Sequence, residues 1–235
     1  MKEKISIETN ESRKVLKYNG ITYSIYDSNS LYTHMYWDFF IPLPLLFQNP
    51  KVLIIGLGGG TILYQFDSLY SNSLSIEVAE ISKSMIENAK SFTGMDLSKF
   101  KIYLEDGSKV VKGKENYYDL IILDAYLNDR IPKQFLKEEF IADAYKALKN
   151  EGILAINYAK KPSIIIEYLC FKVKLSKYFK LYKVNGGSRL NTILIASKSL
   201  TNLEIYNRIS SRMPINQSNK FIIEEYSKLI SKKYK

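Results

Sequence analysis

Residues 51–61 read Lys51-Val52-Leu53-Ile54-Ile55-Gly56-Leu57-Gly58-Gly59-Gly60-Thr61, an apolar run followed by four glycines in five positions. An apolar run without polar alternation predicts a strand buried on both faces, as in a parallel sheet. Glycines directly after such a strand let the backbone turn tightly and approach a ligand where a Cβ atom would collide. These residues therefore predict a buried strand that ends in a nucleoside-binding loop.

An acid and the glycine spacing narrow the kind of nucleoside that this loop would bind. Glu80 lies twenty residues beyond Gly60, at the end of the next predicted strand, where a carboxylate accepts hydrogen bonds from ribose hydroxyls. The Gly-x-Gly-x-Gly spacing favours an adenosyl-sulfonium ligand, because the dinucleotide pattern would need glycine in place of Thr61. The loop residues predicted to bind the ligand are Gly56, Gly58, Gly59 and Gly60.

The chain beyond this loop alternates predicted strands and helices. Further strands are expected at residues 74–80, 101–104, 120–123 and 153–158, and a helix at 163–179 follows them. Strands at 180–184 and 191–197 are joined by a connection through Asn185-Gly186-Gly187-Ser188, which is so short that they must be antiparallel. The pattern predicts an α/β fold with the Rossmann-like sheet of class I S-adenosylmethionine-dependent methyltransferases, parallel with a terminal antiparallel hairpin.

Two further segments flank this sheet. Runs at residues 13–18 and 21–26 are separated by Asn19-Gly20, which predicts a β-hairpin, and an aromatic segment at 31–40 predicts a helix. We expect a small N-terminal β domain with its linking helix at 1–45, a Rossmann-like domain at 46–198 and a basic helical extension at 199–235.

Charge is unevenly distributed along the chain, whose net charge is +10. Residues 160–235 hold 16 Lys and Arg but only 4 Asp and Glu, whereas residues 1–159 are slightly acidic. This basic third could meet nucleic acid, but a solvated lysine surface is favoured because Arg-rich clusters are lacking. A polyanionic substrate is not indicated at the glycine loop.

Apolar runs and cysteine content suggest a cytoplasmic protein. No run reaches the length of a membrane span, and the N-terminus lacks an apolar signal-peptide segment. Cys170 is the one cysteine, so neither a disulfide framework nor a Cys-based metal site is expected within the chain. We expect Cys170 to be packed inside a helix.

Three predicted strands end in acids, and in such sheets ligands lie across these carboxyl ends. Besides Glu80, they are Asp106, followed by Gly107, and Asp124. Asp106 could accept a hydrogen bond from an exocyclic adenine amine. A role as a strand-end cap or a solvated loop acid stays open for each of them.

Asp124 matters most for chemistry, because it ends the strand predicted to lie beside the glycine loop. Asp129 follows five residues later. Two carboxylates in one pocket would hold a cationic amine, and Asp124 could accept its proton as the nitrogen becomes a nucleophile. An exposed Asp129 paired with Arg130 is the alternative.

These residues together resemble the spermidine synthase family. The similar segments are the Gly56–Thr61 loop, Glu80-Ile81, Asp106-Gly107, Tyr118 to Tyr126, Asp129, Ile131-Pro132, Glu139-Phe140 and Tyr32-Thr33-His34-Met35. The resemblance covers about residues 13–198 and implies a small N-terminal β domain and a homodimer. It also implies decarboxylated S-adenosylmethionine as aminopropyl donor, a diamine acceptor such as putrescine, and no metal.

The same resemblance implies a set of acceptor-site residues, with departures from the family's motifs. Tyr32, His34 and Tyr126 would line the amine pocket, with His34 where the family carries an acid. Asp129 would stand in for a second acid missing at its usual spacing, and Gly59 replaces an Asp that faces the donor's amine.

Three functions follow from these features. The first is aminopropyl transfer to a small amine, with Asp124 as amine acceptor and base. The second is methyl transfer from S-adenosylmethionine itself, which Gly59 favours because a lost acid suits a donor that keeps its carboxylate. The third is a nucleoside-binding homologue without turnover.

Overall fold

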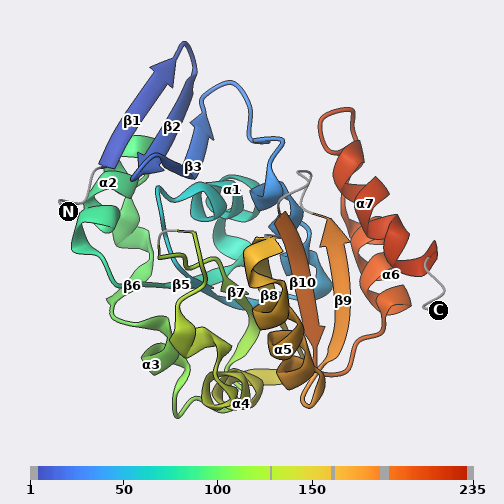
Figure 1. Cartoon of the computed structure of the whole chain (residues 1–235). Coiled ribbons are helices and arrows are strands. Elements are labelled where there is room, and N and C mark those ends of the chain that lie inside the picture. Colours follow the sequence, from blue (N-terminus) through green and yellow to red (C-terminus); the bar gives the residue numbers. More distant parts are fainter. Residues whose placement is uncertain (1–4, 128, 160–161, 186–190, 232–235) are drawn as a thin grey trace.

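The computed structural model describes residues 5–127, 129–159, 162–185 and 191–231. A small antiparallel sheet of β1 (Ile5–Asn10), β2 (Arg13–Tyr18) and β3 (Ile21–Asp27) lies beside a seven-stranded sheet (Figure 1). The predicted hairpin at Asn19-Gly20 is present as β2 and β3. β1 was not predicted from the sequence, and it pairs antiparallel with β2 along its whole length.

The large sheet has the strand order β6-β5-β4-β7-β8-β10-β9. Its strands are β4 (Lys51–Ile55), β5 (Ser75–Glu80), β6 (Lys101–Leu104), β7 (Tyr118–Leu123), β8 (Leu148–Ala159), β9 (Lys180–Asn185) and β10 (Asn191–Ser197). All neighbours are parallel except β10, which runs antiparallel to both β8 and β9. The predicted fold class is confirmed, while the connection predicted at residues 186–188 lies outside the described residues.

Helices cover both faces of this sheet, as its strands require. They are α1 (Thr61–Tyr70), α2 (Lys83–Thr93), α3 (Gly107–Val111), α4 (Glu138–Ala147), α5 (Ile165–Ser176), α6 (Asn202–Arg212) and α7 (Lys220–Ser231). Alternate β4 side chains enter different cores: Leu53 and Ile55 pack with α3, α4 and α5, while Val52 and Ile54 pack with α1. Burial on both faces explains the uninterrupted apolar run.

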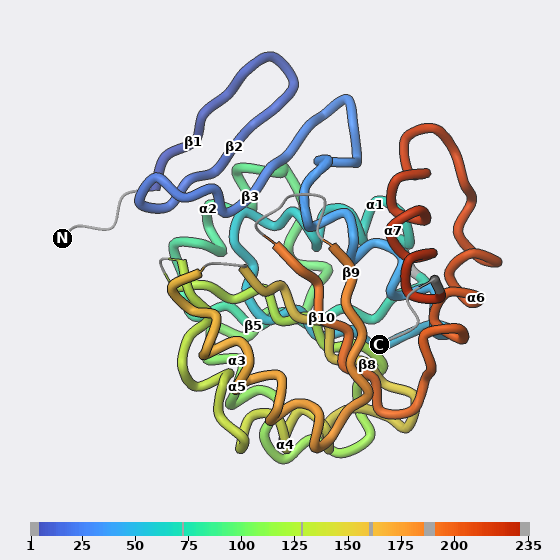
Figure 2. Tube along the Cα trace, turned by 45° about the vertical axis from the view of Figure 1, so that its right-hand side comes forward, coloured from blue at the N-terminus to red at the C-terminus, as the bar shows by residue number. Residues whose placement is uncertain are grey.

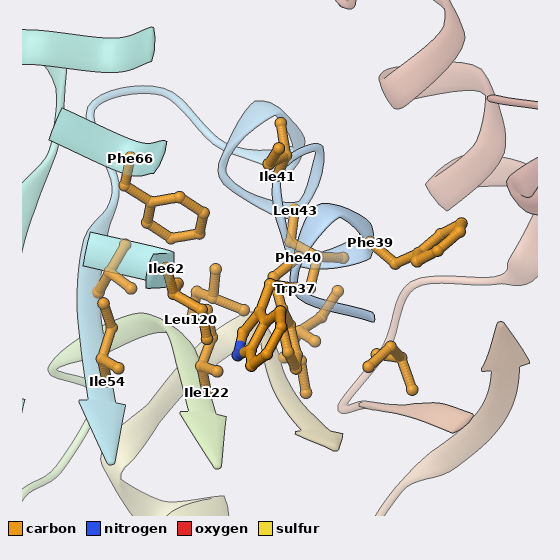
Figure 3. Packing of buried hydrophobic residues seen from close by; sticks show 14 of the residues in the cluster. Trp37, Phe39, Phe40, Ile41, Leu43, Ile54, Ile62, Phe66, Leu120 and Ile122 are labelled. Carbon is orange, nitrogen blue, oxygen red and sulfur yellow. The ribbon is translucent and has the colours of Figure 1, made fainter. Parts of the chain in front are cut away.

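The segment between the two sheets corrects one sequence prediction. Instead of a helix over 31–40, the chain forms short 3-10 helices, η1 (Tyr36–Phe40) and η2 (Leu43–Leu46). The buried Asp38 carboxylate accepts hydrogen bonds from the backbone N–H groups of Thr33 and His34, so these amides do not enter a helix. Figure 3 shows Trp37 and Phe40 of η1 against side chains of α1 and β7.

The C-terminal helices pack on the rest of the chain rather than apart from it. Figures 1 and 2 show α6 and α7 beside β9. The Tyr226 hydroxyl donates a 2.6 Å hydrogen bond to the Phe39 carbonyl, and Arg208 donates to the Leu46 carbonyl at 3.1 Å. The division at residues 45 and 198 stays a prediction, but α6 and α7 share a buried cluster with η1.

Two smaller predictions about helices are corrected. The helix expected at 163–179 is shorter, because a 3-10 turn, η6 (Pro162–Ile164), precedes α5. Cys170 is exposed on α5 and is not packed in the core. Among the described residues, no helix is both long and apolar enough to cross a membrane.

Candidate active site

A cavity of about 550 Å³ lies at the carboxyl ends of β4, β5, β6 and β7. Residues of the small sheet and η1 line it from the other side, so segments far apart in the sequence enclose it. Glu80, Asp106, Asp124 and Asp129 all line this cavity, together with Glu105. The structure thus brings together every acid that the sequence analysis singled out.

The glycine loop divides into two parts with different roles. Gly56 and Gly58 line the cavity and both have positive φ, 92° and 53°. Gly59 and Gly60 do not line it. The Gly59 amide instead donates a 2.6 Å hydrogen bond to the Ser24 hydroxyl of β3, and a Cβ atom at Gly59 would lie 2.7 Å from Ser24 Cβ.

This packing of β3 on the loop concerns position 59, where the resemblance implies an Asp instead of glycine. Besides Ser24, the Phe92 ring would lie 2.9 Å from a Cβ atom at Gly59, so no side chain fits there without rearrangement. Thr61 adds a second link to β3, because its hydroxyl both accepts from the Ile25 amide and donates to the Ile25 carbonyl. A glycine at position 59 therefore lets the small sheet dock on the loop.

Glu80 is held rigidly at the end of β5. One carboxylate oxygen accepts a 2.8 Å hydrogen bond from the Leu57 amide and the other accepts a 2.9 Å bond from the Ser82 amide. The residue is only 8% exposed, yet it lines the cavity. Each oxygen of a carboxylate can accept a second hydrogen bond, so Glu80 retains capacity for ribose hydroxyls.

Asp106 is both a helix cap and a cavity residue. Its Oδ1 accepts hydrogen bonds from the Ser108 amide and hydroxyl, both at 2.8 Å, and its Oδ2 accepts from Gln134 Nε2 at 2.9 Å. Gly107 follows without a side chain because a Cβ atom there would lie 2.4 Å from Ile55 Cγ2. The cap fixes the Asp106 carboxylate at the edge of the cavity.

Asp124 accepts three hydrogen bonds from neutral donors. Asn157 Nδ2 donates to Oδ1 at 2.8 Å, and Trp37 Nε1 and the Tyr36 hydroxyl donate to Oδ2 at 3.2 and 3.4 Å. Burial raises the pKa of Asp124 to about 7, although the three donors act in the opposite direction. A carboxyl group with this pKa can both take up and release a proton near neutral pH.

Aromatic side chains that the sequence analysis did not assign complete the cavity wall. Tyr23 of β3 donates a 3.2 Å hydrogen bond to the Tyr126 carbonyl. Burial raises the pKa of Tyr23 to about 12, and the charges of Asp124 and Asp129 act in the same direction. Asp124 and Asp129 are therefore both close to Tyr23, which the small sheet contributes.

Tyr126 lines the cavity, but its hydroxyl is engaged elsewhere. The hydroxyl donates to the Asn157 carbonyl at 2.9 Å and accepts from the Ala159 amide at 3.0 Å. These bonds attach the loop after β7 to β8. Only the ring of Tyr126 is left to face a substrate.

Tyr32 and His34 lie away from the cavity, contrary to the placement that the resemblance implies. The His34 ring is exposed and lies 5.2 Å from the Phe221 ring of α7, and the Tyr32 ring lies 6.3 Å from the same ring. His34 has a φ of 58°, and its amide donates to Asp38 Oδ2 at 2.7 Å. The next residues, Met35 to Trp37, line the cavity instead.

The sheet order and the acids at the strand ends define an α/β protein with the fold shared by spermidine synthases and S-adenosylmethionine-dependent methyltransferases. The sequence pattern of the spermine/spermidine synthase domain matches residues 32–185, about two thirds of the chain. The chain belongs to the spermine/spermidine synthase domain family.

Curated relatives are polyamine aminopropyltransferases. The protein from Alkaliphilus oremlandii is 35% identical over 136 residues, which are 54% of this chain and 47% of the relative. The protein from Clostridium botulinum is 32% identical over 159 residues, 64% of this chain and 55% of the relative. The chain spans about half the length of the curated relatives it matches.

Solved structures show the same fold at low sequence identity. A probable spermidine synthase from Corynebacterium glutamicum has a TM-score of 0.74 at 16% identity, covering 95% of this chain and 91% of that chain. Spermidine synthase from Thermotoga maritima has a TM-score of 0.69 at 22% identity, covering 94% and 84%. Human methyltransferase-like protein 13 in complex with SAH has a TM-score of 0.59 at 19% identity, covering 85% and 93%.

Proposed function

We propose that this protein transfers an aminopropyl group from decarboxylated S-adenosylmethionine to a small amine. The charge of the cavity carries the proposal: five carboxyl groups line it, and the described lining residues include no Lys, Arg or His. Donor and acceptor would both enter as cations, which nearby carboxylates stabilise. The carboxylate of intact S-adenosylmethionine would meet no basic side chain among the described lining residues.

The donor would lie across the strand ends. Gly56 and Gly58 allow a close approach of the ligand to the backbone, and Glu80 has oxygen lone pairs left for the ribose hydroxyls. Asp106 would accept from the adenine amine. The names of the curated relatives support this assignment of the donor.

Asp124 would act as acceptor for the amine and as its base. An ammonium nitrogen has no lone pair, so Asp124, whose pKa is about 7, first accepts a proton from the acceptor's amine. The free amine nitrogen then attacks the aminopropyl carbon bonded to sulfur, the carbon–sulfur bond breaks with its electron pair going to sulfur, and methylthioadenosine leaves. The new nitrogen–carbon bond leaves one positive charge on nitrogen, and Asp124 passes its proton to solvent. Asp129 would hold a second ammonium group of a diamine.

The first prediction concerns donor choice. We expect decarboxylated S-adenosylmethionine to bind at least about tenfold more tightly than S-adenosylmethionine, because one unpaired carboxylate in an acidic cavity costs about 1.4 kcal/mol or more. Calorimetric titration of the full chain with each donor, and with methylthioadenosine as reference, measures this difference. Incubation with a panel of diamines then measures release of methylthioadenosine.

The outcomes separate the three functions. Tighter binding of S-adenosylmethionine would contradict the proposal and favour methyl transfer. Tight binding of methylthioadenosine without turnover of any diamine would favour a nucleoside-binding protein that does not catalyse the reaction. Release of methylthioadenosine that depends on a diamine would support aminopropyl transfer.

A homodimer belongs to the same proposal, and α5 supplies a surface for it. Ile166, Leu169, Cys170 and Val173 form an exposed stripe at helical spacing, with Ile166 75% and Val173 63% exposed. If two copies of α5 pair antiparallel about a two-fold axis between residues 169 and 170, Ile166 meets the partner's Val173. Glu167 then meets the partner's Lys172, so the charges of the two copies are complementary.

The second prediction tests this surface. We expect light scattering to give twice the chain mass of 27.2 kDa for the wild type and the single mass for Leu169→Glu, because a buried unpaired carboxylate opposes pairing. Leu203 on α6 is equally exposed, at 52%, so Leu203→Glu is the matched control and should stay dimeric. A dimeric Leu169→Glu variant would rule out this surface.

A further inference from the structure

A pair of asparagines connects β10 to Asp124. Asn157 lies in β8 and is 1% exposed, and Asn191 begins β10. In the antiparallel register Asn191 pairs with Ala159 and Ile193 pairs with Asn157, so the two asparagines are diagonal neighbours on one face of the sheet. The side chains of such diagonal neighbours can reach each other across the two strands.

The Asp124 carboxylate sets the direction of the hydrogen bonds that join Asn191, Asn157 and Asp124. Asn191 Nδ2 donates to Asn157 Oδ1 at 2.9 Å, and Asn157 Nδ2 donates to Asp124 Oδ1 at 2.8 Å. An ionised carboxylate can only accept, so the Asn157 amide must turn its NH₂ group toward Asp124. Its oxygen then faces away and needs a donor, which Asn191 provides.

Asp124 depends on such neutral donors. The titratable groups that interact with its charge are the hydroxyls of Tyr36 from η1, Tyr23 from β3 and Tyr126. The carboxylates of Glu80 and Asp129 line the same cavity. None of these carries a positive charge. Among the described residues, the charged form of Asp124 is therefore stabilised by donated hydrogen bonds, of which the bond from Asn157 is the shortest.

We propose that Asn191 is a positioning residue, which holds the Asn157 amide with its NH₂ group toward Asp124. Without the Asn191 donor, the Asn157 oxygen loses its partner, so the orientation that serves an ionised Asp124 becomes less favourable. Its oxygen can then face Asp124, an arrangement that is favourable only when Asp124 is protonated. The catalytic meaning of this arrangement rests on the proposed function, but the arrangement itself does not.

The test is a titration of the Asp124 carboxyl by carbon-13 NMR in the full chain without substrate. In Asn191→Leu, which removes the donor and fills its space against water, we expect the pKa of Asp124 to rise by about one pH unit. Asn191→Ala removes the same donor with less bulk and should shift the pKa in the same direction. Asn191→Gln keeps a donor and should return the pKa toward the wild-type value.

Thr192→Val is the matched control. Thr192 is the next residue of β10, is fully buried, and its hydroxyl has no hydrogen-bond partner among the described residues. We expect this variant to leave the Asp124 titration unchanged, so that a general disturbance of β10 is distinguished from loss of the donor. An Asp124 titration in both Asn191→Leu and Asn191→Ala that matches the wild type would overturn the proposal.

Failure of this inference and failure of the proposed function are distinguishable. If no diamine is turned over, the NMR titration still tests the role of Asn191. If diamines are turned over, the pH profile of kcat/KM for Asn191→Leu should move to higher pH together with the NMR titration. An unmoved profile with normal turnover would reject only the role of Asn191.

Discussion

Replacement of Asp124 by Asn is expected to lower kcat for the proposed aminopropyl transfer by about 1000-fold, which is within the range typical for loss of a general base. The amide keeps the size of the side chain but can neither take up the proton of the amine nor balance its charge. Stopped assays of methylthioadenosine release measure the loss. Calorimetric titration with methylthioadenosine should show that nucleoside binding is retained, because Glu80 and Asp106 are unchanged.

The pH dependence of the rate identifies the same group. With the pKa of Asp124 at about 7, the wild-type rate should rise as pH increases and reach half its maximum near pH 7, where the carboxyl loses its proton. The Asp124→Asn variant should lack this rise. Glu87 on α2 is 66% exposed in its side chain, so Glu87→Gln is a matched control that should keep the wild-type profile.

The free energy of unfolding should also depend on pH, because folding raises the pKa of Asp124. Because the folded-state pKa of Asp124 lies above that of the unfolded chain, the folded state binds more protons between about pH 4 and 7. The contribution of Asp124 to stability is thus lost as pH rises through this window. Asp124→Asn should be at least as stable as the wild type at pH 8, and a variant that is both inactive and unfolded would not support a catalytic role.

Replacement of Gly56 by Ala is expected to destabilise the fold by about 3–5 kcal/mol, the sum of a backbone collision and strain at positive φ. A Cβ atom at Gly56 would lie 2.6 Å from the Asp124 carbonyl oxygen and 2.8 Å from Ala125 Cα. These are backbone atoms of the segment after β7 and cannot rotate away. Thermal denaturation should show a decrease in Tm of about 10 °C.

Gly113 provides the control for this experiment. Its φ is 74°, but no atom lies within 4 Å of a Cβ built there, so Gly113→Ala carries the strain without the collision. We expect a loss of about 1–2 kcal/mol for it. Equal losses for Gly56→Ala and Gly113→Ala would contradict the close contact between the glycine loop and the Asp124 backbone.

Much of the fold could be predicted because its signals are local. The apolar run at 51–55, the alternation of strands and helices, and the Asn19-Gly20 turn each follow from short segments. The segment at 31–40 was predicted wrongly because its backbone follows the buried Asp38, whose partner Gln65 comes from α1. Local helical spacing carries no information about such a partner.

The strand-end acids of the candidate site were predictable for a related reason. In a parallel sheet the carboxyl ends of neighbouring strands lie at one edge, so order along the chain alone brings Glu80, Asp106 and Asp124 together. The residues around Asp124 were not predictable in this way. Trp37 reaches it from η1, and Asn157 donates to it from β8.

The sequence by itself determined the glycine loop, the alternation of strands and helices and the acids at the strand ends, since these depend on local backbone and burial preferences. Only the tertiary structure decided that Gly59 faces β3, that Tyr32 and His34 lie against α7, and that Asn191 connects to Asp124 through Asn157. The physical reason is that β3 docks on the loop and β10 inserts beside β8, which brings together residues whose separation in the chain gives no local signal.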